Sequence, residues 1–206
     1  MFRRYRVLNR SRRHKKILER GPTLSRPLVF LLILTQATIV AHANEKGLFL
    51  SIYGGTFSSS SVDFRAVYSR EPAAVIGIGL GHQTWGRVST FVEFMHYAQY
   101  SRRWNEADRR MWTADLGFAY ALLARDEHSL EVSAGGMIGL SREDIPDGEK
   151  FGVAGAFAGL SFLRRFEGTP LAVVLDGRYR YAPPLNSILT TDYSGTTVKL
   201  GLRYML

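Results

Sequence analysis

The chain contains 206 residues, no cysteine and a formal net charge of +9 at pH 7. Residues 1–43 hold ten of its 27 basic residues and a single acidic residue, Glu19, so that residues 44–206 hold 17 residues of each sign and are neutral overall. A nucleic-acid-binding domain carries a basic surplus on its folded part, and we therefore expect no nucleic-acid partner. Without cysteine, neither a disulfide framework nor a lipidated cysteine can form.

Residues 1–43 have the pattern of a secretory signal peptide with a long basic first part. An apolar run follows at 27–40, and Ala-His-Ala at 41–43 predicts cleavage at that point. The run is shorter than the roughly 20 residues that a spanning helix needs, so a retained anchor is the less favoured alternative. General secretion is favoured over twin-arginine export because Lys15 and Lys16 stand where that motif has apolar residues. The true translation start stays open.

Residues 44–206 suit one domain and contain eight segments in which apolar and polar residues alternate. This period of two is typical of β-strands with two different faces. In chain order the predicted strands cover 47–57, 74–83, 87–100, 111–123, 129–140, 151–163, 171–181 and 199–206. Each is about ten residues long or slightly longer, the length with which a tilted strand crosses a membrane.

The alternation assigns two faces to every predicted strand except one. In the first strand Leu50 and Ile52 share one face and Ser51 and Tyr53 the other, and in the second strand an Ile/Leu row opposes a row of glycines. Such glycines leave room for large neighbours on the inner face. The strand at 151–163 is so rich in Ala and Gly that its faces cannot be assigned.

Long and short connections alternate along the chain. The predicted long connections cover 58–73, 101–110, 141–150 and 182–195, and the short ones cover 84–86, 124–128 and 164–170. Bacterial outer-membrane barrels have long extracellular loops and short periplasmic turns. An even number of strands brings both ends of the domain to the periplasmic side, and closure of the sheet removes the unpaired edges that lipid would not tolerate.

The last strand runs to the final residue with large apolar residues on one face. Its order of Lys199, Gly201, Tyr204 and Leu206 resembles the C-terminal signal by which the bacterial barrel-assembly machinery recognises its substrates. The usual final residue of that signal is Phe, which Leu206 replaces here.

The domain at 44–206 resembles the small eight-stranded outer-membrane barrels, namely the transmembrane domain of OmpA, OmpX and the opacity-type surface proteins. The resemblance rests on topology, leader and terminal strand. It implies an all-β, antiparallel, up-and-down transmembrane β-barrel in the cell outer membrane of a Gram-negative bacterium, with both mature termini in the periplasm. The expected partners are outer-membrane lipid, lipopolysaccharide, the barrel-assembly machinery and an extracellular ligand bound through the loops. We expect a monomer with a structural or surface-interaction role.

The inner face collects equal numbers of acidic and basic residues. The predicted lumen network consists of Glu93, Asp115, Glu131, Asp176, Arg178, Arg180, Lys199 and Arg203. Charges inside an eight-stranded barrel are tolerated when they are paired. A plug of salt bridges is therefore the favoured interpretation. A narrow ion-conducting channel is the alternative, whereas a wide porin would need about 16 to 18 strands.

A lipid A-modifying enzyme is a further alternative. Ester hydrolysis would need a hydroxyl nucleophile with a histidine base, and His128 with Ser129, near Glu127 and Glu131, supplies the residue types. Adjacent strand residues point to opposite faces, and His128 lies in a predicted turn, so we expect no enzyme. Metal-ligand spacings and phosphate loops are absent from the sequence, and we expect no cofactor and no metal.

Aromatic residues near predicted strand ends indicate a membrane interface. They are Trp112, Tyr97, Tyr100, Tyr120, Tyr179, Tyr181 and Tyr204. A soluble ligand carrier would instead place its apolar residues inside. Four arginines border the second long connection, and we predict that they contact lipopolysaccharide phosphates: Arg102, Arg103, Arg109 and Arg110.

Overall fold

The computed structural model describes residues 47–61, 72–99, 108–144, 150–183 and 192–206, and the predicted signal peptide at 1–43 lies outside this part. The described residues form eight strands. These are β1 (Leu48–Ser59), β2 (Ala73–Trp85), β3 (Val88–Gln99), β4 (Asp108–Ala124), β5 (His128–Asp144), β6 (Lys150–Arg165), β7 (Leu171–Tyr181) and β8 (Gly195–Met205). No helix long and apolar enough to cross a membrane occurs among the described residues.

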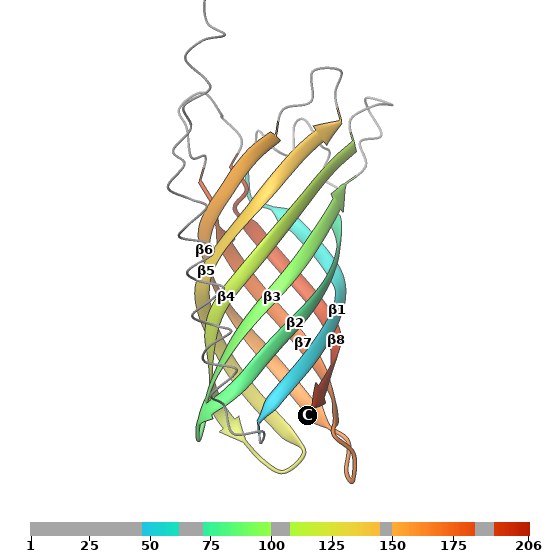
Figure 1. The fold of residues 1–206 in the computed structure, drawn as a ribbon, viewed down its shortest axis with the longest axis vertical. Helices are drawn as coiled ribbons and strands as arrows, with labels where there is room; N and C mark the ends of the chain where they lie inside the picture. The colour runs from blue at the N-terminus through green and yellow to red at the C-terminus, as the bar shows by residue number, and fades with distance from the viewer. Residues whose placement is uncertain (1–46, 62–71, 100–107, 145–149, 184–191) are drawn as a thin grey trace, which may run out of the picture. The chain divides into compact units, whose positions relative to one another are not determined.

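The eight strands form one closed antiparallel barrel (Figure 1). Each strand pairs with the next along the chain, and β8 pairs with β1, so that Ser51 of β1 lies opposite both Gly79 of β2 and Arg203 of β8. The predicted all-β, eight-stranded, up-and-down barrel is therefore confirmed. The connections 86–87, 125–127 and 166–170 lie at one end of the barrel, which we call the turn end, and the opposite end is the loop end.

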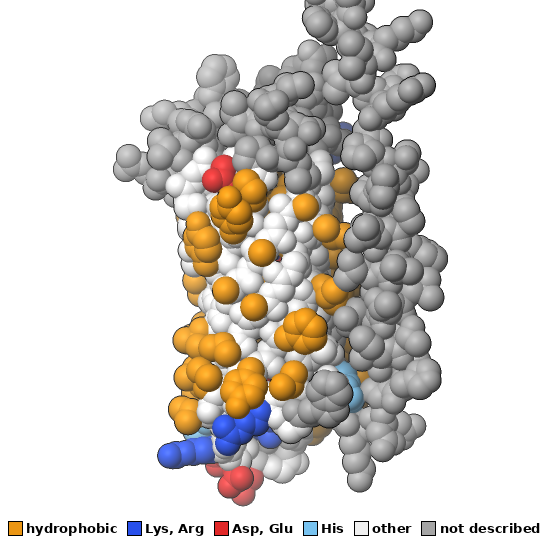
Figure 2. Space-filling model, turned by 90° about the vertical axis from the view of Figure 1, so that its left-hand side faces the viewer, with side chains coloured by type: hydrophobic (Ala, Val, Ile, Leu, Met, Phe, Trp, Pro, Cys, Tyr) orange, Lys and Arg blue, Asp and Glu red, His pale blue; other side chains and the backbone are white. Residues whose placement is uncertain are grey.

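The inner and outer faces follow the predicted alternation. In β7 the inward residues Asp176, Arg178 and Arg180 are buried, while Leu175 and Tyr179 are about half exposed on the outside. Hydrophobic side chains accordingly gather on the outer wall (Figure 2). The faces of β6, which the sequence left open, are set by its register with β5 and β7. Its inward residues include Val153, Phe157, Ser161 and Leu163.

The predicted long connections at 101–110 and 141–150 are partly wrong, because β4 and β5 continue into them. Arg110 lies opposite Arg142, and Arg109 lies opposite Glu143, in the same ladder that joins the apolar parts of the strands. Backbone hydrogen bonds join two strands whatever their side chains are. The end of the apolar alternation in the sequence therefore did not mark the ends of β4 and β5. The connection 145–149 is consequently no longer than the turn 166–170.

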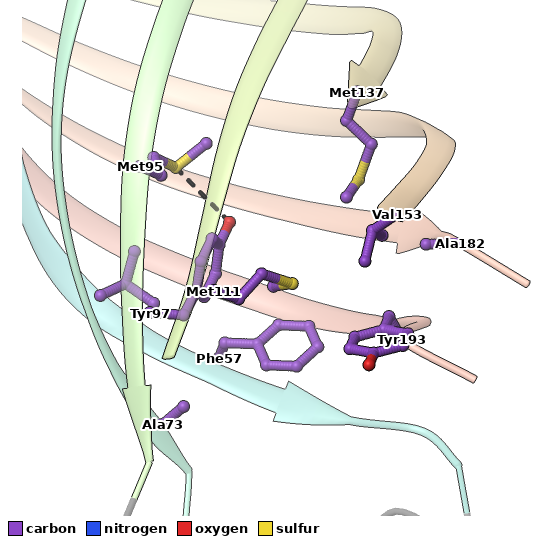
Figure 3. Packing of buried hydrophobic residues seen from close by; sticks show 10 residues of the cluster. Phe57, Ala73, Met95, Tyr97, Met111, Met137, Val153, Ala182 and Tyr193 are labelled. Carbon is purple, nitrogen blue, oxygen red and sulfur yellow. Dashed lines mark hydrogen bonds between the residues drawn. The ribbon is translucent and has the colours of Figure 1, made fainter. Parts of the chain in front are cut away.

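Apolar side chains fill the lumen on both sides of its middle. The loop-end cluster, shown in Figure 3, includes Phe57, Met95, Tyr97, Met111 and Tyr193. Two further clusters lie toward the turn end. One contains Phe49, Phe91, Ala119 and Phe157, and the other contains Tyr53, Leu163 and Val174. Charged residues occupy the space between these apolar layers.

Candidate functional site

Six charged side chains meet in the middle of the lumen. They are Glu93 of β3, Asp115 of β4, Asp176, Arg178 and Arg180 of β7, and Lys199 of β8, and each is at most 3% exposed. Each lies at an inward position of its strand, so the alternation brings them to the same space. Three acids and three bases give this central network no net charge when all are ionised.

Arg178 is bound by two carboxylates. Its Nη1 and Nη2 donate to the two oxygens of Glu93 at 2.8 and 2.9 Å, and its Nε and Nη2 donate to Oδ2 of Asp176 at 3.0 and 2.8 Å. The same Oδ2 accepts a hydrogen bond from the hydroxyl of Ser161 at 3.0 Å. All three nitrogens of the guanidinium therefore have partners, the condition under which a buried charge is tolerated.

Arg180 has a separate carboxylate. Nη1 and Nη2 donate to the two oxygens of Asp115 at 3.0 and 2.6 Å, and Nε donates to the hydroxyl of Thr197 at 3.0 Å. The sulfur atoms of Met95 and Met137 lie 3.4 and 3.5 Å from this guanidinium. This arrangement ties β7 to β4 and β8 across the lumen.

Lys199 joins the first group. Its Nζ donates to Oε2 of Glu93 at 2.7 Å and lies 3.9 Å from Oδ1 of Asp176. Arg178 in turn lies 3.8 Å from Oδ2 of Asp115, which connects the Arg178 and Arg180 groups into one network. Glu93 thus binds two cations from two different strands.

Each of the four predicted lumen cations also lies over an aromatic ring. Arg178 contacts both Phe91 and Phe157, with its Cζ 4.8 and 5.0 Å from the two ring centroids. The other cation–ring pairs are Arg180 with Tyr97 at 5.5 Å, Lys199 with Tyr53 at 4.4 Å and Arg203 with Phe49 at 4.2 Å. Such contacts are attractive because the ring face is negative. The alternation in the sequence had assigned Tyr53 to the inner face with Ser51, but the contacts between cations and rings were not predicted.

Two inward glycines provide the space for the network. A Cβ at Gly159 would lie 2.5 Å from Cγ of Arg178, and a Cβ at Gly79 would lie 2.9 Å from Cγ of Glu93. Both distances are shorter than a side chain tolerates. At these two positions, inner-face glycines therefore make room for large neighbours, as the sequence predicted for β2.

The remaining predicted lumen pair lies nearer the turn end. Nη1 of Arg203 donates to Oε2 of Glu131 at 3.4 Å, and the two side chains are 11% and 12% exposed. The structure therefore places all eight predicted charges in the lumen, six in the central network and two in this separate pair.

The fold has counterparts among solved structures. It is similar to Neisserial surface protein A (TM-score 0.61, 11% identity, 79% of this chain and 98% of that one) and to the N-terminal β-barrel domain of Pseudomonas aeruginosa OprF (0.55, 12%, 78% and 98%). It is also similar to Ail, the attachment invasion locus protein of Yersinia pestis (0.50, 13%, 78% and 99%). The chain has the fold of the small outer-membrane β-barrels. No family model and no curated protein sequence matches it.

Within this small outer-membrane barrel fold, His128 and Ser129 do not form a catalytic pair. Ser129 is buried and faces inward, whereas His128 is exposed and stacks on Phe162 of the outer face at 5.8 Å. The structure thus agrees with the expectation that adjacent residues point to opposite sides. Among the described residues, no group of three His, Asp or Glu side chains could hold a metal ion.

The predicted lipopolysaccharide contacts are described only in part. Arg102 and Arg103 lie outside the described residues, and Arg109 is described in its backbone alone. Arg110 is exposed on the outer face of β4, two ladder positions beyond the Trp112–Leu140 pair. It lies opposite Arg142, which is also exposed. Two arginines are therefore neighbours at the loop end of the outer wall.

The expected outer position of Tyr97 is wrong. Tyr97 is 3% exposed in the lumen, where its ring packs edge-on against Phe57 at 5.6 Å and its hydroxyl contacts the sulfur of Met95 (Figure 3). Its odd position in β3 places it on the same face as Glu93, and this parity outweighs nearness to the strand end. Tyr100 lies outside the described residues. The other five aromatics are exposed on the barrel wall: Trp112, Tyr120, Tyr179, Tyr181 and Tyr204.

The residues of the predicted assembly signal divide between the two faces of β8. Lys199 belongs to the central network, and a Cβ at Gly201 would lie 2.5 Å from Cδ1 of Tyr53, so both have a role in lumen packing. Tyr204 and Leu206 are exposed. Recognition by the assembly machinery stays a prediction.

Proposed function

We propose that this protein is an integral outer-membrane barrel with a plugged lumen and a structural or surface-interaction role. The observation that carries the proposal is the layered interior, in which a neutral ion-pair network lies between apolar clusters. The outer wall supports the membrane location, because Ile76, Phe118 and Leu200 are each at least 60% exposed. Such a wall would be costly in water and suits lipid.

The proposed orientation places the turn end in the periplasm and the loop end outside the cell. Short turns lie on the periplasmic side of bacterial barrels, and both Leu48 and Met205, the outermost residues of β1 and β8, lie at the turn end. Partners outside the cell would then reach the loop end. The names of two proteins with a similar fold, a surface protein and an attachment invasion locus protein, agree with such a role.

We further propose that the loop-end arginines bind lipopolysaccharide phosphates. Arg110 and Arg142 face outward from neighbouring strands, next to the exposed apolar residues Trp112 and Leu140 on the same face. Guanidinium groups bind phosphate through paired hydrogen bonds. Replacing both arginines with glutamine should weaken lipopolysaccharide binding by the purified protein. Unchanged binding would remove this part of the proposal.

Two measurements test the main proposal. The full chain would be produced with its leader in a Gram-negative host, and its outer-membrane fraction would be run on a gel with and without boiling. Migration that changes on boiling is expected of a membrane barrel, whereas a water-soluble monomer would contradict the location. Purified protein in planar bilayers should show no sustained conductance. A steady ion current would contradict the plug and favour the channel.

A further inference from the structure

A cavity of about 60 Å³ lies at the turn end of the lumen, beyond the central network. Its walls include Arg87 from the connection between β2 and β3, Ser129 and Glu131 of β5, Arg165 at the end of β6 and Arg203 of β8. A cavity of this volume holds a few water molecules or one small polyatomic ion.

The charge of this wall differs from that of the central network. Three of the residues that line the cavity are arginines, Arg87, Arg165 and Arg203, and one lining residue, Glu131, carries a carboxylate. Only Arg203 is bound to that carboxylate, through Nη1 at 3.4 Å. The residues that line the cavity therefore carry two more positive than negative charges, whereas the six charges of the central network balance.

Two hydrogen-bond donors in this wall are buried without a partner in the described part of the chain. They are the hydroxyl of Ser129, a residue only 5% exposed, and Nε of Arg203, a residue 9% exposed. Buried polar atoms nearly always have partners. Two such donors beside one cationic cavity indicate that an acceptor completes their hydrogen bonding.

The arginines at the rim are held by their backbones. The carbonyl of Arg87 accepts a hydrogen bond from the backbone N–H of Ala121 at 2.9 Å, and the N–H of Arg165 donates to the carbonyl of Glu127 at 2.7 Å. Their side chains are exposed at the mouth of the cavity. Arg164, one residue earlier, faces outward instead, opposite Val173.

We propose that this turn-end cavity is a binding site for phosphate, either free or as the terminal group of a larger molecule. A phosphate carries between one and two negative charges near pH 7, which matches the surplus of the wall. Its oxygens accept hydrogen bonds from guanidinium forks and hydroxyl groups. In the proposed orientation the site opens to the periplasm, although binding itself does not depend on that orientation.

The test uses ¹⁵N-labelled full-length protein in a zwitterionic detergent, titrated with inorganic phosphate at constant ionic strength. The reporter is the Nε–H resonance of Arg203, assigned by its loss in Arg203→Lys. A saturable shift is expected, with a single dissociation constant. A shift that stays linear, as non-specific ion binding would give, overturns the proposal.

Three variants distinguish the site from general electrostatics. Arg87→Gln and Arg165→Gln should each weaken phosphate binding by about tenfold, the loss of one charge-assisted hydrogen bond. Arg164→Gln removes the same charge from the outward neighbour and should change binding by less than about twofold. Equal losses in Arg164→Gln and Arg165→Gln would contradict a built site.

Glu131→Gln separates binding from barrel stability. The substitution removes the single carboxylate of the wall and frees Arg203, so phosphate should bind several-fold more tightly even if the barrel becomes less stable. A purely structural role for Arg203 and Glu131 predicts no gain, and that result would count against the site.

A parallel titration with phenyl phosphate distinguishes free phosphate from the terminal phosphate of a larger molecule. Affinity equal to that of inorganic phosphate supports the terminal group of a larger molecule, and weaker binding supports the free anion.

Discussion

Arg178 of β7 and Glu93 of β3 are joined by two parallel hydrogen bonds of 2.8 and 2.9 Å. The two strands are not neighbours in the sheet, so this ion pair connects opposite parts of the barrel wall. Glu93 also accepts from Lys199 of β8. One carboxylate therefore holds three strands through the lumen, in addition to the backbone ladders at the wall.

Glu93→Gln should strongly destabilise the barrel. The substitution leaves Arg178 and Lys199 buried with one carboxylate fewer, and removing one member of a buried ion pair costs about 3–5 kcal/mol. The measurement is the free energy of unfolding in urea, with the protein refolded into lipid vesicles.

The matched control for Glu93→Gln is Glu131→Gln. The Glu131–Arg203 bond is longer, at 3.4 Å, and both side chains are partly exposed. Loss of this bond should cost about 1 kcal/mol. Equal losses in the two variants would show that the central network has no special role in stability.

Arg180 and Asp115 should behave as a coupled pair. Arg180→Met leaves the Asp115 carboxylate buried without its guanidinium, and Asp115→Leu leaves the cation, so each single substitution should cost about 3–5 kcal/mol. The double variant should lose less than the sum by at least about 1 kcal/mol, because neither charge is then left alone. Unfolding free energies of all four proteins check this cycle. Additive losses would contradict a direct interaction.

The sequence sufficed to identify the charged residues of the lumen but not their partners. Alternation assigns Glu93 and Arg178 to the inner face because each strand residue points to one side or the other. Whether two inward residues of β3 and β7 meet depends on strand tilt and stagger around the barrel, which a single strand does not encode. The pairing across the lumen therefore required the structure.

The position of one ring beside the cations, that of Tyr97, was predicted wrongly for a different reason. Tyr97 was assigned to the outer wall because aromatic residues are common at membrane interfaces, yet its parity with Glu93 already placed it inside. The ends of β4 and β5 were misplaced because Arg110 and Arg142 lack apolar alternation, although their backbones continue the ladder. The odd or even position of a residue in its strand thus predicted its face reliably, whereas its residue type near a strand end did not.

Gly159→Ala should disturb the network directly. The new methyl group would lie 2.5 Å from Cγ of Arg178 and 2.8 Å from the carbonyl oxygen of Gly177, so the Arg178 side chain must move from its carboxylates. Overpacking of this kind costs about 1–3 kcal/mol. The control is Gly177→Ala on the adjacent strand, where the nearest atom to the new Cβ is 4.0 Å away. Similar unfolding midpoints for both variants would refute the role of Gly159 as a space provider.

Charged substitutions on the outer wall test the membrane location by depth. Leu200 lies near the middle of β8 and is 60% exposed, whereas Tyr204 lies near its turn end and is 45% exposed. In a membrane, Leu200→Arg should cost about 2–4 kcal/mol and Tyr204→Arg about 0–1 kcal/mol, because the penalty for a charge falls from the bilayer centre to the interface. Unfolding in lipid vesicles measures both values. A soluble ligand carrier would place both positions in water and lose little from either change, so two small and equal effects would exclude a membrane-spanning wall.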